Sequence, residues 1–354
     1  MTAASYAWTS LPSLDAARVY MSVSFYDGLV YVVGGCDEMG QPVSSLEAFD
    51  IASKAWIKLR NMPTKRAAPI VAAFDGKIVA IGGVGSTQAP VDSVELYNIG
   101  ENKWKRLQAL SEPLMGMASF LKDNKVHIFG GMGVDTNPRD HFKCFAIGSS
   151  GEKWQAFPPM PSPRYSAQAF YKNSKAYVIG GRQGKIPVCA FEVFDYDLRV
   201  WVKYPDILSK RVFLCYAMTD NFIITLGGLK QTAQQGFSDT CEMYCLDQCN
   251  KGEWQTNKRI AIPTKRGDFV SCTIDNQVLV AGGLGNGGKP ISSVELFDPE
   301  TRKWKRLSDM PRAHSTCGSI FCAGKFFVFG GITEEGPSST CEVFELAETS
   351  ATSG

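Results

Sequence analysis

The sequence is poor in the residues that most catalytic centres require. Its 354 residues include only three histidines, His127, His141 and His314, which lie far apart in the chain. No G-x-S-x-G motif occurs, so the turn that exposes the serine nucleophile of α/β-hydrolases has no counterpart here. His127 lies in an apolar run, which favours a hydrogen-bonded structural role over catalysis. We therefore expect a protein without catalytic residues and without a cofactor.

A strong charge imbalance and a long apolar run are also missing. Lysine and arginine number 37 and aspartate and glutamate 35, which gives a net charge of +2 and does not favour binding to nucleic acid. The chain contains no run of eighteen apolar residues, which a membrane-spanning helix would need. The first residues lack the basic and apolar segments of a secretory signal peptide. We expect a soluble monomer that contacts neither nucleic acid nor membranes.

The cysteines do not form a recognisable framework. There are eleven of them, an odd number, and no C-x-x-C pair, which favours reduced thiols in the cytoplasm, with the nucleus as the alternative compartment. Cys241, Cys245 and Cys249 are spaced by four, but they fall in an expected strand and the turn after it. This is not a zinc-ligand spacing, so we expect buried thiols and no metal site.

A pair of glycines at the end of an apolar run recurs seven times. The first example is VYVVGG, and the gaps between successive pairs are 48, 48, 50, 47, 55 and 48 residues. The second glycines are Gly35, Gly83, Gly131, Gly181, Gly228, Gly283 and Gly331. A period near fifty residues indicates a repeat architecture. A phosphate-binding glycine loop would need a helix directly after the glycines, and no such pattern follows.

One repeat is predicted to contain four strands and no helix. In the second repeat, the expected strands are residues 68–74, 78–83, 93–99 and 104–107, and Asp75-Gly76 is a hairpin-turn dipeptide between the first two. The third strand alternates apolar and polar residues, as a half-buried strand does. Glycines at the end of the second strand allow positive φ and a close approach of another backbone.

Seven tryptophans mark the fourth strand, and their distribution predicts a closed ring. Six of them follow a Gly-Gly pair by 20 to 26 residues, but the last pair has none after it and Trp8 has none before it. The strand that is missing from the end of the chain is therefore present at its beginning. We expect residues Ser5 to Leu11 to complete the last repeat, Ser315 to Leu346, and to bury Trp8 there.

The combination of these features resembles the kelch repeat: Gly-Gly after the second strand, glutamate in the third and tryptophan in the fourth. The glutamates are Glu47, Glu95, Glu192, Glu242, Glu295 and Glu342. The stretches ARVY, GGMGVDTNP, GGRQGKIPVCAFEVFD, TKRGDFV and VAGGLGN look like the kelch domain-containing protein 8 group. The resemblance implies an all-β fold, a seven-bladed β-propeller with four antiparallel strands per blade. Two departures are Lys143 in place of the third-repeat glutamate and a long loop from Leu229 to Thr240.

The expected domain is a single propeller over residues 1–347, followed by a flexible tail at 348–354. The expected blades span about residues 15–61, 62–109, 110–158, 159–205, 206–258, 259–309, and 310–347 together with 1–14.

A second periodic residue suggests a binding site. Seventeen residues before each second glycine, five repeats have arginine, and the other two have Leu114 and His314. The arginines are Arg18, Arg66, Arg164, Arg211 and Arg266. Each position lies on the connection that leads into the next blade, so we expect these residues to line one mouth of the central channel. The alternative is structural: each arginine pairs with the periodic glutamate or caps backbone carbonyls.

The resemblance implies that this mouth and the loops after Gly-Gly bind peptides through arginines that contact acidic side chains. Guanidinium groups in a concave mouth favour carboxylates for the same reason. We therefore expect a non-catalytic protein-interaction module, a substrate receptor or scaffold, that binds an acidic peptide segment through Arg18, Arg66, Arg164, Arg211, Arg266 and His314. Two alternatives stay open: a cytoskeletal scaffold that binds through the outer blade faces, and a sugar isomerase or oxidase on this fold.

Overall fold

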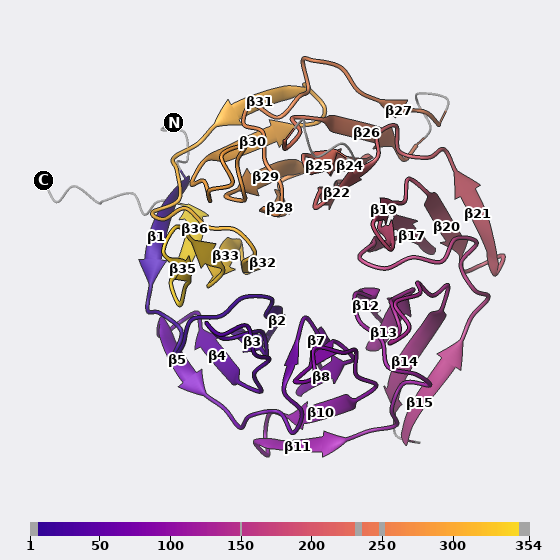
Figure 1. The fold of residues 1–354 in the computed structure, drawn as a ribbon, viewed down its shortest axis with the longest axis vertical. Coiled ribbons are helices and arrows are strands. Elements are labelled where there is room, and N and C mark those ends of the chain that lie inside the picture. Colours follow the sequence, from indigo (N-terminus) through magenta and orange to yellow (C-terminus); the bar gives the residue numbers. More distant parts are fainter. Residues whose placement is uncertain (1–5, 149–150, 231–235, 248–251, 347–354) are drawn as a thin grey trace, which may run out of the picture.

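The computed structural model describes residues 6–148, 151–230, 236–247 and 252–346. In these residues the chain forms seven four-stranded antiparallel sheets and no helix. The sheets are arranged as blades around a central channel, in chain order (Figure 1). The expected all-β, seven-bladed propeller is confirmed. No helix in this part of the chain is long and apolar enough to cross a membrane.

Each blade runs from an inner to an outer strand. The first blade contains β2 (Ser22–Tyr26), β3 (Leu29–Val33), β4 (Leu46–Asp50) and β5 (Ala55–Lys58). The second contains β7 (Ile70–Phe74), β8 (Lys77–Ile81), β10 (Val94–Asn98) and β11 (Lys103–Arg106). The third contains β12 (Ala118–Lys122), β13 (Lys125–Phe129), β14 (Phe142–Gly148) and β15 (Gly151–Ala156). The fourth contains β16 (Gln168–Lys172), β17 (Lys175–Ile179), β20 (Phe191–Asp195) and β21 (Val200–Tyr204). The fifth contains β23 (Cys215–Met218), β24 (Phe222–Leu226), β26 (Cys241–Cys245) and β27 (Trp254–Gln255).

The sixth blade contains β28 (Val270–Ile274), β29 (Gln277–Ala281), β30 (Val294–Asp298) and β31 (Lys303–Arg306). The seventh contains β32 (Gly318–Cys322), β33 (Lys325–Phe329), β36 (Cys341–Leu346) and β1 (Tyr6–Leu11). Four short two-stranded pairs lie outside these sheets. They are β6 (Arg66–Ala67) with β9 (Val84–Gly85), β18 (Arg182–Gln183) with β19 (Ile186–Pro187), β22 (Arg211–Val212) with β25 (Leu229–Lys230), and β34 (Ile332–Thr333) with β35 (Gly336–Pro337).

The ring is closed by the two ends of the chain. Strand β1 pairs antiparallel with β36, and Trp8 stands opposite Phe344. In Figure 1 the indigo strand lies beside the yellow strands of the seventh blade. The expected closure by the N-terminal strand is therefore confirmed for Tyr6 to Leu11. Ser5 and the expected flexible tail at 348–354 lie outside the described residues.

The Gly-Gly pairs join each blade to the next. Gly35 has a φ of +108°, and its N–H donates a hydrogen bond to the carbonyl oxygen of Arg66 over 3.0 Å. A Cβ on Gly34 would lie 2.4 Å from that same oxygen. The first glycine is therefore needed for the close approach of the next blade, and the second for its left-handed conformation. Five further second glycines donate to the equivalent carbonyl: Gly83 to Leu114, Gly131 to Arg164, Gly228 to Arg266, Gly283 to His314 and Gly331 to Arg18.

The hydrophobic core lies between the faces of neighbouring blades. It forms seven main clusters in the described residues, one at each blade-to-blade interface, and each contains one tryptophan. The indole N–H of Trp56 donates to the carbonyl of Pro12 over 2.7 Å, and that of Trp304 donates to Ile260 over 2.9 Å. Four further tryptophans make the equivalent bond: Trp104, Trp154, Trp201 and Trp254.

Trp8 is the exception, because its buried indole nitrogen has no hydrogen-bond partner in the described residues. Its side chain is half-buried, less covered than the largely buried position expected from the sequence. The closing blade therefore relies on strand pairing and on aromatic contacts, such as the Trp8–Phe344 pair with ring centroids 5.1 Å apart.

We expect Trp56→Ala and Trp304→Ala to lower the free energy of unfolding by similar amounts, somewhat less than the ~3–5 kcal/mol typical of a fully buried tryptophan. Trp8→Ala should have a smaller effect by about 1 kcal/mol, because no hydrogen bond is lost. Deletion of residues 1–11 should be worse than any of the three, since it also exposes the edge of β36. Urea denaturation followed by fluorescence checks these differences, and an unchanged stability after the deletion would contradict the closed ring.

Candidate functional site

The six side chains expected at the channel mouth do lie around one end of the channel, but they are not exposed. Arg18, Arg66, Arg164, Arg211, Arg266 and His314 are all between 0% and 2% exposed, and Leu114 at the seventh position is fully buried as well. The expectation that these residues form an open rim is therefore wrong. The reason is that each of the five guanidinium groups donates hydrogen bonds to backbone carbonyls at or after the Gly-Gly pair of its own blade.

Each of the five arginines pairs with the glutamate in the third strand of its blade. The distance between Arg66 Nη2 and Glu95 Oε2 is 2.5 Å, and both side chains are fully buried. The other pairs are Arg18–Glu47, Arg164–Glu192, Arg211–Glu242 and Arg266–Glu295. His314 Nε2 lies 3.4 Å from Glu342 Oε1. The structural alternative is confirmed, whereas contact between these residues and a partner stays an untested prediction.

The guanidinium also holds the loop after Gly-Gly. Arg66 Nη1 donates to the carbonyls of Ser93, over 2.9 Å, and Gly82, over 3.3 Å. Burial lowers the pKa of Arg66 below its ordinary value, and attraction to Glu95 acts in the opposite direction. The hydroxyl of Thr64, on the same connection, donates to the second oxygen of Glu95 over 2.6 Å. The connection, the loop and the third strand are thus fixed to one another from within.

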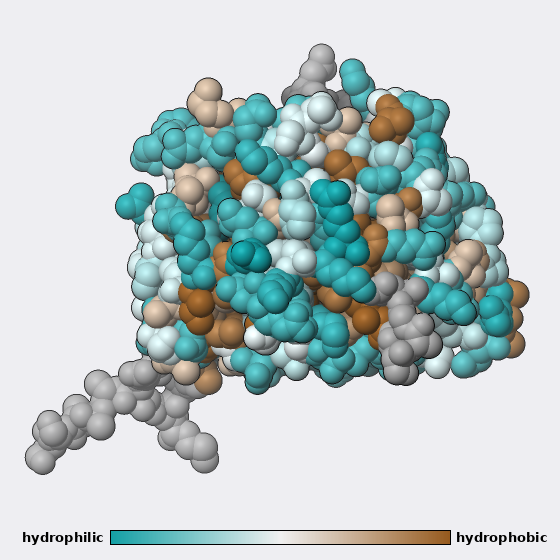
Figure 2. Space-filling model, turned by 90° about the horizontal axis from the view of Figure 1, so that it is seen from below, coloured by the Kyte–Doolittle hydropathy of each residue, from teal (hydrophilic) through white to brown (hydrophobic). Residues whose placement is uncertain are grey.

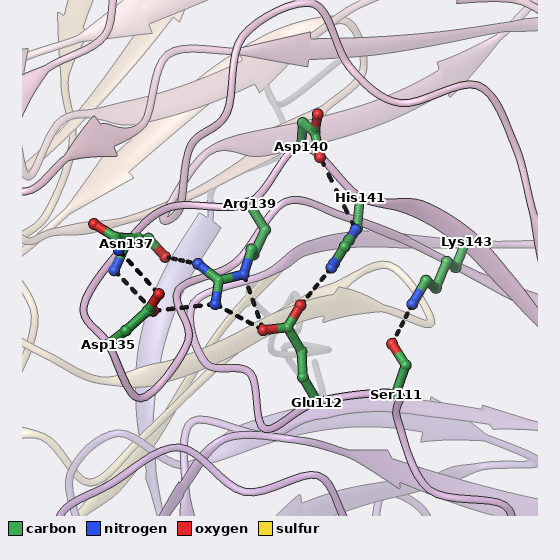
Figure 3. A network of polar contacts seen from close by, with 8 residues as sticks. All are labelled: Ser111, Glu112, Asp135, Asn137, Arg139, Asp140, His141 and Lys143. Atoms are coloured by element: carbon green, nitrogen blue, oxygen red, sulfur yellow. Dashed lines mark hydrogen bonds and ion pairs between the residues drawn. The ribbon is translucent and has the colours of Figure 1, made fainter.

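The third blade replaces this buried pair with a half-exposed network (Figure 3). Its acid is Glu112, which lies on the connection, where the other blades have the base, and its base is Arg139, which lies on the loop. Arg139 donates to Glu112 from Nε over 2.9 Å and from Nη2 over 2.7 Å. His141 Nε2 lies 2.7 Å from the other oxygen of Glu112. The hydrogen bond from Arg139 lowers the pKa of Glu112.

Lys143 occupies the position in the third strand at which the other blades have the glutamate. Its ammonium leaves the interior and donates to the hydroxyl of Ser111 over 2.6 Å. Leu114 fills the buried place of the arginine. The sequence pattern identified Leu114 and Lys143 as exceptions at the two periodic positions. It did not identify the compensating Glu112–Arg139 pair, because those residues lie at offsets where the other repeats have no ion pair.

The residues that do face the channel mouth lie two positions after the buried set. We call these seven residues the collar: Tyr20, Ala68, Gly116, Ser166, Phe213, Asp268 and Thr316. All seven have a positive φ, between +46° and +63°. Tyr20 and Phe213 are 54% and 52% exposed. Five of the seven line a cavity of about 500 Å³ at this end of the channel: Tyr20, Ala68, Gly116, Asp268 and Thr316.

Sequence reasoning missed the collar because its residue type changes in every repeat. The only signal is its constant offset of two residues from the arginine position. Backbone hydrogen bonds join some neighbours, such as Ala68 N to Tyr20 O over 2.8 Å and Asp268 N to Phe213 O over 3.0 Å. Non-glycine residues in the left-handed region cost about 1–3 kcal/mol each and are concentrated at binding and active sites.

One cation accompanies the exposed aromatic residues of the mouth. The guanidinium carbon of Arg182 lies 5.7 Å from the ring centre of Tyr165 and 5.6 Å from that of Phe213. Its Nε has no hydrogen-bond partner in the described part of the chain. The guanidinium therefore stacks on the two rings at the mouth, with its Nε buried and the rest of the side chain partly exposed.

The described residues contain no group of three histidine, cysteine, aspartate or glutamate side chains that could hold a metal ion. Cys241 and Cys245 are buried in β26, and Cys249 lies outside the described residues. His127 is 3% exposed and stacks on Phe120, while the hydroxyl of Tyr196 lies 2.9 Å from its Nδ1. These contacts are those of a structural histidine in the core.

Comparisons with known proteins agree with the repeat pattern. The model of the Kelch motif matches residues 17–63, 66–111 and 265–311. Kelch domain-containing protein 8B of Rattus norvegicus and of Homo sapiens are each 37% identical to this chain over 174 residues, 47% of this chain and 48% of theirs. The match thus spans about half the length of these curated relatives. Kelch-like protein 40 of Xenopus tropicalis is 28% identical over 156 residues, 44% of this chain and 25% of its own.

A solved structure titled "Structure of YjhT" superimposes with a TM-score of 0.64 and 18% sequence identity, over 84% of this chain and 99% of that chain. This likeness supports the propeller fold. The ring of blades, the Gly-Gly pairs and the matches of motif and sequence define the class as kelch-type β-propellers, which in general are protein-interaction modules. Three segments of the chain thus match the Kelch motif, and part of the chain is similar to kelch domain-containing protein 8B.

Arg66→Leu should lower the free energy of unfolding by about 3–5 kcal/mol, because it leaves the buried carboxylate of Glu95 without its cation. Adding Glu95→Lys reproduces the pair Leu114 and Lys143 of the third blade and should recover part of the loss. Urea denaturation of both variants and of Glu95→Lys alone gives the coupling between the two positions. Equal stability of the single Arg66→Leu variant and the wild type would contradict a structural role for the pair.

Burial lowers the pKa of His127 to about 4, below its usual value of about 6.5. Between pH 6.5 and 4 the unfolded chain therefore binds a proton that the folded chain does not. The free energy of unfolding should fall as the pH decreases through this window, by at most about 1.4 kcal/mol per pH unit.

His127→Phe should flatten this pH dependence, whereas Tyr196→Phe, which keeps the histidine, should not. Chemical denaturation at several pH values checks the slopes. An identical slope in wild type and His127→Phe would show that His127 is not the responsible group.

Proposed function

We propose that this kelch propeller is a non-catalytic interaction module that binds a segment of another protein at the collar, as a substrate receptor or a scaffold. The observation that carries the proposal is the left-handed conformation of all seven collar residues, six of them not glycine, at the mouth of the channel. Exposed Tyr20 and Phe213 add large amphipathic side chains, which are enriched among the residues that contribute most to protein binding.

In this proposal the buried arginines and His314 support the collar from behind and do not touch the partner. A buried guanidinium that reached a ligand would have to leave its glutamate uncompensated in the interior. The acidic part of the partner segment instead contacts exposed cations of the same mouth. The partly exposed Arg182, whose guanidinium stacks on the ring of Phe213, is one of them. Lys65, Lys210 and Lys265, which directly precede three of the buried arginines, are exposed as well.

The scaffold alternative, binding through the outer faces of the blades, has one observation in its favour. Most of the wall seen in Figure 2 is hydrophilic, with small separate hydrophobic areas. The outer strand β21 differs from β11 and β31, which read Lys-Trp-Lys-Arg, because it exposes Val200 and Val202 at 46% and 43%. With two exposed valines and Lys203 as its one lysine, β21 is less protected against pairing with another chain than β11 and β31.

A pair of double variants separates the two sites. Tyr20→Ser with Phe213→Ser removes the collar aromatics, and Val200→Ser with Val202→Ser is the matched change at the outer edge. Purification of tagged proteins from cells, followed by crosslinking and mass spectrometry, should show partners lost from the collar variant and kept by the edge variant. Thermal denaturation confirms that both variants are folded. Partners lost only from the edge variant would move the site to the outer face.

A further inference from the structure

The loops that follow the Gly-Gly pairs carry opposite charges on opposite sides of the mouth. On the acidic side, the first-blade loop contributes Asp37 and Glu38, and the seventh-blade loop contributes Glu334 and Glu335 between β34 and β35. On the basic side, the fourth-blade loop contributes Arg182 and Lys185, and the fifth-blade loop begins with Lys230. The fourth-blade loop has no carboxylate, and the fifth has one, Asp239, at its far end.

The two sides face each other across the channel. Figure 1 shows β35 of the seventh blade and β19 of the fourth blade on opposite sides of the central opening. Each side also has one exposed collar aromatic. Tyr20 lies on the connection into the first blade, and Phe213 lies on the connection into the fifth, under Arg182. A segment that crosses the mouth from one side to the other therefore meets both aromatics and both charges.

The charges are available to a ligand because few of them are neutralised locally. Arg182, Lys185 and Lys230 form no ion pair within the part of the chain that the structure describes. On the acidic side, Glu334 pairs with Lys289 of the sixth blade, but both side chains remain largely exposed.

Two other carboxylates of the acidic side, Asp37 and Glu335, accept hydrogen bonds within their own loops. Asp37 accepts hydrogen bonds from the N–H groups of Met39 and Gln41, each over 2.9 Å, which fix its loop. A hydrogen bond with Thr333 lowers the pKa of Glu335, and Arg312 acts in the same direction from nearby. Even with Lys289 and Arg312 counted against it, this side carries an excess of negative charge.

Two charged sides of opposite sign favour a ligand of matching polarity. At physiological ionic strength a charged group is influenced mainly by charges within about 8 Å. One end of a bound segment is therefore governed by the acidic side and the other end by the basic side. A uniformly acidic segment would be attracted at one end and repelled at the other.

We propose that the mouth takes an extended protein segment that is basic at one end, acidic at the other and apolar in the middle. This inference rests on the proposed function and specifies the partner for that same site. The acidic end lies over Arg182, Lys185 and Lys230, the basic end lies over Glu38 and Glu335, and the apolar middle crosses the collar between Phe213 and Tyr20. The expected partner motif is thus charge-balanced, and the acidic peptide predicted from the sequence represents only half of it.

The test uses displayed pools of twelve-residue peptides with eight randomised central residues, which span at most about 28 Å when extended. Two residues are fixed at each end: Lys-Lys and Glu-Glu in either order, Glu-Glu at both ends, Lys-Lys at both ends, or Ser-Ser at both ends. Selection against the wild-type protein should enrich a pool with opposite ends. Fluorescence anisotropy of selected peptides and their end-swapped versions then gives the affinities.

Charge-reversal variants sharpen the test. Glu38→Lys with Glu335→Lys should shift the preference to the pool with two acidic ends, and Lys185→Glu with Lys230→Glu should shift it to the pool with two basic ends. We expect a change of about threefold to tenfold in each affinity, since exposed ion pairs are individually weak. Lys103→Glu with Lys303→Glu, a matched reversal on the outer strands β11 and β31, should leave the preference unchanged.

The outcomes separate the two proposals. If the pool with two acidic ends binds wild type best and binding is lost in Tyr20→Ser with Phe213→Ser, the charge-balanced motif is overturned and the collar site stands. If selected peptides bind that collar variant as tightly as they bind wild type, or if no pool is enriched, the collar site is overturned as well. If the outer-strand control shifts the preference as much as the mouth variants do, the assignment of the charges to the two sides is wrong.

Discussion

The ion pair between a buried arginine and a buried glutamate is the interaction on which the mouth of this propeller depends. In five of the seven blades it links the connection that enters the blade with the third strand, and the remaining N–H groups of the guanidinium hold the intervening loop. Buried ion pairs contribute little net stability compared with well-packed apolar side chains, but breaking one is strongly destabilising. Their value here is geometric, because each fixes one loop and one collar residue relative to the sheet.

The two departing blades show which part of that geometry is essential. In the third blade the buried pair is replaced by Leu114 and by the half-exposed pair of Glu112 and Arg139, with the acid on the connection and the base on the loop. In the seventh, His314 takes the place of arginine, 3.4 Å from Glu342. In the third blade an ion pair still joins the connection to the loop. In the seventh, a contact between histidine and glutamate still joins the connection to the third strand. The link between these elements is therefore required, whereas the identity and direction of the charge are not.

The sequence was sufficient to predict what repeats. The Gly-Gly pairs, the tryptophans and the spare strand at the N-terminus predicted the seven blades and the closure between β1 and β36, because identical packing in every blade requires the same residue at the same offset. The arginines were also recognised as a set. Their exposure was predicted wrongly, since periodicity shows that a residue is required and does not show which way its side chain points. Burial of the arginine depends on its pairing with a glutamate about thirty residues away, and both structural and binding roles are compatible with that spacing.

The collar could not have been predicted from the repeat pattern for the opposite reason. Each collar residue lies between two fixed points. One is the carbonyl of the arginine position, which in six of the seven repeats accepts a hydrogen bond from a Gly-Gly pair, and the other is the inner strand that begins a few residues later. These constraints determine the backbone and leave the side chain free, so the position contains tyrosine, alanine, glycine, serine, phenylalanine, aspartate and threonine in turn. The loops above it vary in charge for the same reason. A rigid repeated frame that presents non-repeating side chains at one mouth can change what it recognises without changing its fold.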